Sequence, residues 1–135
     1  MENQNNNISN QGYPQQYFQE LKRSIDGLDC MKIQEIVNII FDAYKKDKQI
    51  FVLGNGGSAS TASHFACDLG KGTLKNVYKP NDKRFRVISL TDNVATLIAY
   101  ANDLSFDDIF VQQLKYLINE GYVVIGLSGS GNSQN

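Results

Sequence analysis

The chain has 135 residues, which suits one domain, and 41% of them are hydrophobic, which is enough for a core. Thirteen lysines and arginines against fourteen aspartates and glutamates give a net charge of −1, so the composition carries no electrostatic signal for nucleic-acid binding. No apolar run approaches the roughly 20 residues of a membrane span, and the N-terminus lacks the features of a secretory signal. We therefore expect a cytoplasmic protein that binds neither nucleic acid nor membranes.

The N-terminal part divides into a tail and two helices. Residues 1–13 are rich in Asn and Gln and have little to bury, so we expect a disordered tail there and a folded domain over 14–135. The apolar spacing predicts a helix over 15–26 that stops at Gly27, followed by a second helix capped by Asp29. The second helix carries an apolar stripe made of Ile33, Ile36, Val37, Ile40, Phe41 and Tyr44. Lys45 and Lys46 are typical of its C-terminus.

From residue 50 onward strands and helices alternate. The pattern predicts strands over 50–53, 85–90 and 122–127 and helices over 58–69, 93–101 and 107–120, with a long loop over 71–84. Such alternation is typical of an α/β fold with a parallel sheet flanked by helices on both faces. Ligands in these sheets bind beyond the carboxyl ends of the strands, so loops at those ends are the first candidates for a site.

Two glycine-rich loops follow predicted strands. Gly54-Asn55-Gly56-Gly57-Ser58 comes after the first strand, and Ser128-Gly129-Ser130-Gly131-Asn132-Ser133 comes after the last. Glycines bring the backbone close to a ligand, and the first turn of a following helix offers unpaired N–H groups to an anion. Neither loop contains a nucleotide-binding fingerprint, so their hydroxyls favour a phosphorylated sugar. Two ordinary strand-to-helix turns are the alternative, which is credible for one loop and less so for both.

Four polar residues are candidates for chemistry. His64 and Asp68 are spaced i, i+4 on one helix face, where a carboxylate can orient an imidazole or act as a base; a solvated pair is the structural alternative. Asp92 and Asn93 follow the middle predicted strand, and each is a candidate for a sugar-hydroxyl contact or for the cap of the next helix.

Two further polar pairs are expected to serve the fold. Asp107 or Asp108 is interpreted as the cap of the helix over 107–120. Asn102-Asp103 is interpreted as a turn before it.

The ordered motifs resemble the sugar isomerase (SIS) domain family over residues 15–135. They comprise the two loops, His64-Phe65-Ala66-x-Asp68-Leu69 between them, and Asn102-Asp103 with Asp108-Ile109-Phe110 further on. The phosphoheptose isomerase branch, which interconverts sedoheptulose 7-phosphate and a heptose 7-phosphate in heptose biosynthesis, is the most similar. The resemblance implies a three-layer, flavodoxin-like fold and a homotetramer with sites between subunits.

The resemblance also implies roles for individual residues. Asp68 lies at the position of the family's catalytic glutamate, and His64 is similar to a residue that helps some members hold zinc, so Asp68 and His64 are the implied catalytic pair and the implied zinc ligands. Asn55 and Asp92 or Asn93 are implied to contact the sugar. The hydroxyls of four serines are implied to hold the phosphate and nearby sugar oxygens: Ser58, Ser128, Ser130 and Ser133. Their loop neighbours Gly56, Gly57 and Gly129 are predicted phosphate-binding residues because glycine lets the backbone approach a ligand.

Two departures from the family pattern modify this interpretation. Asp68 is one methylene shorter than glutamate, which moves the carboxylate by roughly 1 Å. The family's domain continues beyond the second loop and supplies an acid histidine there, whereas His64 is the only histidine of this sequence. We therefore expect a C-terminally truncated SIS domain that is inactive as it stands. The alternative function is a non-catalytic SIS module that binds a phosphosugar or a protein, as in related replication-initiation regulators.

Overall fold

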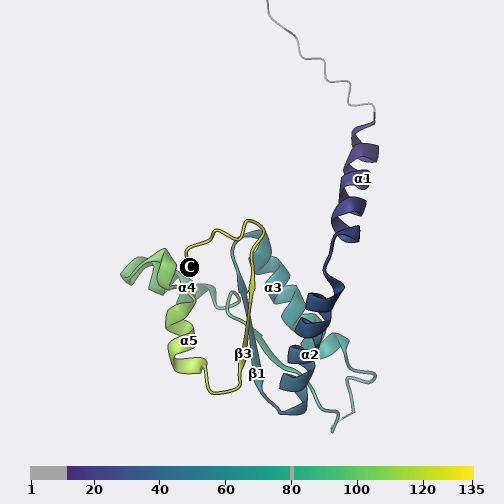
Figure 1. The fold of residues 1–135 in the computed structure, drawn as a ribbon. Helices are drawn as coiled ribbons and strands as arrows, with labels where there is room; N and C mark the ends of the chain where they lie inside the picture. Colours follow the sequence, from purple (N-terminus) through teal and green to yellow (C-terminus); the bar gives the residue numbers. More distant parts are fainter. Residues whose placement is uncertain (1–11, 80) are drawn as a thin grey trace, which may run out of the picture. The chain divides into compact units, whose positions relative to one another are not determined.

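Three parallel strands form the centre of the fold, flanked by helices as the alternating pattern predicts (Figure 1). The computed structural model describes residues 12–79 and 81–135. The elements are α1 (Tyr13–Asp26), α2 (Cys30–Lys45), β1 (Gln49–Gly54), α3 (Gly57–Cys67), a π-helix (Asp68–Gly72), β2 (Arg86–Ser89), α4 (Val94–Asp103), a 3-10 helix (Phe106–Asp108), α5 (Val111–Leu117) and β3 (Val123–Leu127). The α/β class with helices around a parallel sheet is confirmed.

Residues up to 35 and residues 36–135 are two separate units. In the first unit α1 begins at Tyr13, so the predicted tail over 1–13 extends too far by that residue. Residues 1–11 of this tail lie outside the described residues. The N–H of Gly27 donates to the Arg23 carbonyl at 3.0 Å and ends α1 as predicted. The Asp29 carboxylate accepts the N–H groups of Met31 at 3.0 Å and Lys32 at 3.2 Å, which confirms the predicted cap of α2.

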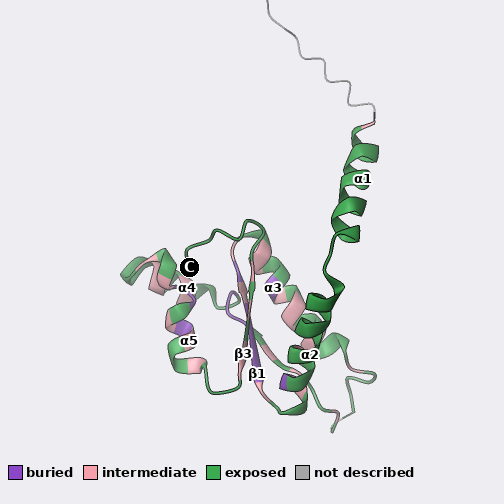
Figure 2. Cartoon of the chain, viewed as in Figure 1, coloured by how far each residue is buried: buried purple, intermediate pink, exposed green. Residues whose placement is uncertain are grey.

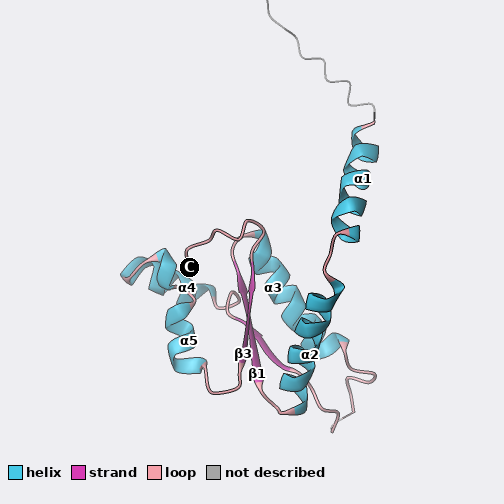
Figure 3. Ribbon diagram, viewed as in Figure 1, coloured by secondary structure: helices cyan, strands magenta, loops and turns pink. Residues whose placement is uncertain are grey.

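In the second unit β1 lies between β2 and β3, and all pairings are parallel. Ile50 and Val52 of β1 pack on one side of the sheet in a core cluster that includes Ala43 of α2 and Ala62 of α3. Phe51 packs on the other side in a cluster with Ile109 and Phe110, which leads into α5. Figure 2 shows that β1 is buried, and Figure 3 shows that it lies between these helices.

The strand order creates a topological switch point at β1. The chain passes from β1 through α3 to β2 at one edge, and returns through α4 and α5 to β3 at the other edge. Crossovers of a parallel sheet keep one hand, so the two connections cover opposite faces. Ligands in open α/β sheets bind where the strand order reverses in this way, which here is the carboxyl end of β1.

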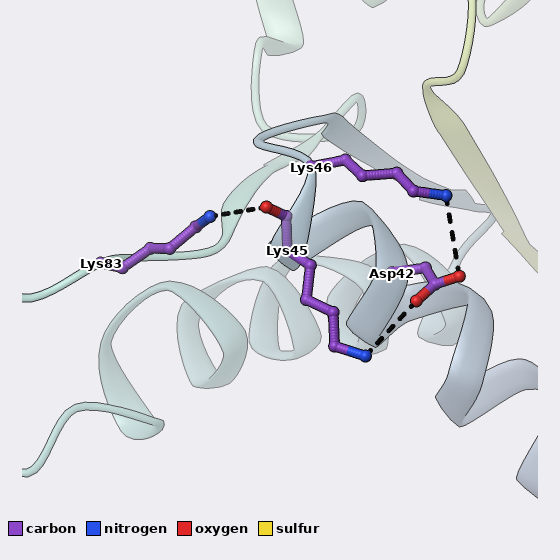
Figure 4. A network of polar contacts seen from close by, with 4 residues as sticks. All are labelled: Asp42, Lys45, Lys46 and Lys83. Atoms are coloured by element: carbon purple, nitrogen blue, oxygen red, sulfur yellow. Dashed lines mark hydrogen bonds and ion pairs between the residues drawn. The ribbon is translucent and has the colours of Figure 1, made fainter.

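Charged side chains form a network of polar contacts at the end of α2 (Figure 4). Lys45 and Lys46 lie 3.6 and 3.8 Å from the Asp42 carboxylate, as expected for cations at a helix C-terminus. The Nζ of Lys83 donates to the Lys45 carbonyl at 2.9 Å and lies 3.2 Å from the Asp47 carboxylate. These contacts anchor the end of the predicted long loop just before β2.

The prediction of one helix over 107–120 is wrong, because this segment contains the end of the 3-10 helix and the shorter α5. The predicted capping role of Asp107 or Asp108 is also wrong. The Asp108 carboxylate instead accepts hydrogen bonds from the Ser105 hydroxyl at 2.7 Å and the Gln112 amide at 2.9 Å, so it joins the two short helices. No side-chain cap hydrogen bond is present at the N-terminus of α5.

The turn predicted at Asn102-Asp103 is wrong as well, since both residues belong to the last turn of α4. The N–H of Leu104 donates to the Tyr100 carbonyl at 3.0 Å, which extends the helical bonding past them.

Asp108 gives the fold a pH dependence. The pKa of its carboxyl is lowered, first by the hydrogen bond from Ser105 and then by that from Gln112. Because the pKa of this carboxyl is lower in the folded state than in the unfolded state, its ionised form stabilises the fold. This stabilisation is complete above the unfolded-state pKa of about 3.9, and it is lost as the pH falls through the folded-state pKa. We expect Asp108→Asn to be less stable than wild type at pH 7, with a difference that shrinks below about pH 4. Urea denaturation at pH 7 and pH 3 measures this, with Asp107→Asn as control; a pH-independent difference would contradict it.

Candidate functional site

The first glycine loop joins β1 to α3 by a close approach. A Cβ on Gly54 would lie 2.8 Å from the carbonyl carbon, the carbonyl oxygen and the Cβ of Ser58, so only glycine fits. Gly56 has φ +52°, in the range that favours glycine. The Asn55 carbonyl accepts the Ser58 N–H at 2.9 Å, which starts the helix. Gly56 and Gly57 are exposed and border open space, so the N-terminus of α3 is accessible to an anion.

The second loop follows β3 and is shaped by its own serines. The Ser128 hydroxyl oxygen accepts the Gly131 N–H at 2.9 Å, and the Ser130 oxygen accepts the Asn132 N–H at 3.2 Å. Gly131 has φ +69°, which glycine adopts without strain. A serine that accepts a hydrogen bond keeps its own O–H to donate. Both serines therefore build the loop and retain a donor for a ligand.

The two loops meet at one cavity. Gly54 and Leu127 are register partners at the carboxyl ends of neighbouring strands, so both loops leave the same edge of the sheet. A cavity of about 150 Å³ lies between them, with Asn55, Ser128 and Ser133 in its lining. Asn135 and Phe110 also line it, and neither was a predicted site residue, although Phe110 belongs to the motif Asp108-Ile109-Phe110. A second cavity of about 250 Å³ adjoins the first at Gly54 and Asn55 and is mainly apolar; Gly56 lies in its lining.

The remaining predicted phosphate ligands lie in the same two loops. Gly57, Ser58, Gly129 and Ser130 are loop residues that line neither cavity. Ser58 is half-buried in the first turn of α3, whereas Ser130 is exposed. Their contact with a phosphate stays a prediction.

Asp92 and Asn93 hold structural elements together. The Asn93 side chain accepts the Thr96 N–H at 3.1 Å and caps α4, which was one of its two predicted roles. The Asp92 carboxylate accepts a hydrogen bond from the Ser63 hydroxyl of α3. Neither side chain lines the two cavities. A sugar contact by either residue stays a prediction, and Ser63 is a partner that the sequence did not indicate.

His64 and Asp68 form the predicted i, i+4 pair. The Nε2 of His64 lies 3.4 Å from an Asp68 carboxylate oxygen, and the two side chains are 78% and 65% exposed. Asp68 follows α3 as the first residue of the π-helix, in which its carbonyl accepts the Thr73 N–H at 3.1 Å. Single π turns of this kind are frequent at functional sites. The two side chains lie within ion-pair distance of each other, but neither residue lines the two cavities.

A zinc site cannot be completed from the described residues. Zinc in proteins takes at least three side-chain ligands in its catalytic sites and four in structural ones. Over residues 12–79 and 81–135 no group of three or more His, Cys, Asp or Glu side chains could hold a metal ion. His64 and Asp68 are two donors, so the residues present do not fit a zinc centre by themselves.

Among residues 12–79 and 81–135, no helix has the length and apolar character that crossing a membrane requires.

The fold and the loops define the class of this protein: an α/β domain with a cavity between two glycine loops at the carboxyl ends of neighbouring parallel strands. Residues 16–135 match the SIS domain family, and the chain belongs to that family. This confirms the family resemblance of the sequence.

Relatives of known name agree with the phosphoheptose isomerase branch. The chain is 37% identical to a phosphoheptose isomerase of Helicobacter pylori over 85% of its own length and 57% of that protein. It is 38% identical to a phosphoheptose isomerase of Clostridium acetobutylicum over 82% of its own length, and 54% of the relative is covered. A probable phosphoheptose isomerase of Thermoplasma acidophilum is also 38% identical, over 88% of the chain and 63% of the relative.

Solved structures give the same result. A phosphoheptose isomerase from Neisseria gonorrhoeae superposes with a TM-score of 0.78 at 28% identity, over 93% of this chain and 64% of the other. One from Francisella tularensis superposes with a TM-score of 0.80 at 25% identity, over 95% and 66%. The chain thus spans a little over half to two thirds of the length of the relatives it matches.

Proposed function

We propose that the loops over 54–58 and 128–133 bind the phosphate of a phosphorylated sugar. The observation that carries this proposal is the single cavity of about 150 Å³ at which both loops meet. An accessible helix N-terminus and the hydroxyls of Ser128 and Ser133 supply the hydrogen-bond donors that a phosphate needs. The names of the matched relatives support a heptose phosphate as the sugar.

The reaction that fits is the isomerisation of sedoheptulose 7-phosphate in heptose biosynthesis. An aldose–ketose interconversion moves a proton between adjacent carbons through an enediol, so it needs a carboxylate base and an acid that protonates the oxygen. Asp68 is the proposed base, and His64, 3.4 Å away, orients its carboxylate. His64 is the only histidine of the sequence. We therefore assign sugar binding to the two loops and the base to Asp68, and we assign the acid to no residue of this sequence.

Ligand-dependent stability tests the binding proposal. Sedoheptulose 7-phosphate at 100 times its Kd is expected to raise the free energy of unfolding by about 2.7 kcal/mol, because it binds only the folded state. Unphosphorylated sedoheptulose at the same concentration serves as the control and is expected to have little effect. Equal stabilisation by both sugars would show that the loops do not bind phosphate.

Turnover separates the isomerase from the alternative function. The native protein is isolated from its source, its intact mass is compared with 15.1 kDa, and it is incubated with sedoheptulose 7-phosphate. Formation of the aldose phosphate supports the isomerase. Ligand-dependent stabilisation without product supports a non-catalytic SIS module, which the short Asp68 side chain and its position outside both cavities favour.

The proposed working form is a cytoplasmic homotetramer. Apolar side chains exposed on α2 and β3 support association, since Ile36, Ile39 and Val124 line an open groove of about 290 Å³. Exposed apolar surface of this kind is typical of protein–protein contacts.

A further inference from the structure

The side-chain amides of Asn55 and Asn135 pair with each other. The Nδ2 of Asn55 donates to the Oδ1 of Asn135 at 2.7 Å, and the Nδ2 of Asn135 donates to the Oδ1 of Asn55 at 3.1 Å. Both residues are half-buried, and both line the cavity of about 150 Å³. The pair therefore joins the two loops at the point where the ligand is proposed to bind.

Other hydrogen bonds of the second loop stay within it. The N–H groups of Gly131 and Asn132 donate to Ser128 and Ser130, and the Gln134 amide donates to the Asn132 carbonyl at 3.4 Å. Among residues 12–79 and 81–135, the two hydrogen bonds of this amide pair are the side-chain hydrogen bonds that connect the second loop to the first. Without it, the second loop keeps its local shape but loses its polar attachment to the glycine loop.

We propose that Asn135 is a positioning residue of the phosphate site, which it builds by holding the second loop against Asn55. This inference rests on the proposed phosphosugar site. Each amide uses one N–H in the pair and keeps a second N–H. The pair thus fixes the separation of Ser128 and Ser133 from the N-terminus of α3 through two neutral side-chain amides. A side-chain carboxylate at position 135 would lose the N–H that Asn55 accepts, and it would add a charge that repels a phosphate.

Two substitutions at Asn135 distinguish the loss of the amide pair from the effect of an added charge. We expect Asn135→Ala to weaken the binding of inorganic phosphate to the 135-residue chain about fivefold, the effect of losing hydrogen bonds of ordinary strength. Asn135→Asp has the same shape and is expected to weaken binding more than alanine does, because its charge faces the anion. Isothermal titration calorimetry measures the affinities, and circular dichroism confirms that each variant is folded.

Two further variants test whether the residue acts through Asn55. Gln134→Ala is the matched control: it removes a neighbouring amide that does not reach the first loop, and it is expected to leave the affinity unchanged. Asn55→Ala and Asn135→Ala are expected to be non-additive, so that the double variant binds phosphate scarcely more weakly than either single variant.

The outcomes distinguish this inference from the proposed function. If wild type binds phosphate and the Asn135 variants bind equally well, the inference is overturned while the proposed function stands. Additive effects of Asn55→Ala and Asn135→Ala, or equal losses for alanine and aspartate at position 135, also overturn it. If wild type binds neither inorganic phosphate nor sedoheptulose 7-phosphate, both the inference and the proposed function fall.

Discussion

Gly54→Ala is expected to lower the free energy of unfolding by about 3 kcal/mol, at the upper end of what overpacking costs. The added Cβ would lie 2.8 Å from the carbonyl carbon, the carbonyl oxygen and the Cβ of Ser58, and two of these are backbone atoms that cannot rotate away. β1 and the first turn of α3 must then separate. Because that turn carries the proposed anion site, phosphate binding is expected to be lost together with stability. Urea denaturation with and without phosphate measures both effects.

Gly57→Ala is the matched control in the same loop. A Cβ at Gly57 meets nothing within 4 Å, and the residue begins α3, where alanine is well tolerated. Its free energy of unfolding is expected to stay within about 0.5 kcal/mol of wild type. If Gly54→Ala unfolds at the same urea concentration as Gly57→Ala, the close approach of β1 and α3 does not restrict position 54.

Asp68→Asn is expected to reduce the isomerase activity of the native protein by about 1,000-fold, within the range of general acid–base catalysis. The amide cannot accept the proton that the enediol mechanism removes from carbon. Binding of sedoheptulose 7-phosphate is expected to persist, because the two loops hold the phosphate. The measurement is kcat with aldose formation as readout, together with the affinity for the substrate.

Two comparisons sharpen this result. Glu120→Gln removes an exposed carboxylate in the segment between α5 and β3 and is expected to leave kcat unchanged. Asp68→Glu restores the side chain that the family resemblance places there, and it is expected to retain activity because it keeps a carboxylate at position 68. Retention of activity by Asp68→Asn would show that another residue is the base, whereas a wild-type protein that binds without turnover would favour the non-catalytic module.

Local patterns predicted much of this structure correctly. Three correctly predicted features depend only on residues within four positions along the chain: the cap at Asp29, the end of α1 at Gly27 and the cap at Asn93. The two glycine loops were also recognisable, because each directly follows a short apolar strand. The prediction of one helix over 107–120 failed because the helix is interrupted. The Asp108 carboxylate accepts hydrogen bonds from side chains on both sides of this break. The apolar periodicity gives no sign of that break.

The sequence by itself determined the order of strands and helices, the α/β class, the two candidate loops and the family. The tertiary structure decided that β1 lies between β2 and β3, and therefore that both loops open into one cavity. It also decided that Asn55 pairs with Asn135 and that Asp92 bonds to Ser63. The physical reason is distance along the chain. Caps and periodicity arise from neighbouring residues, whereas strand order and cavity lining depend on contacts between segments tens of residues apart.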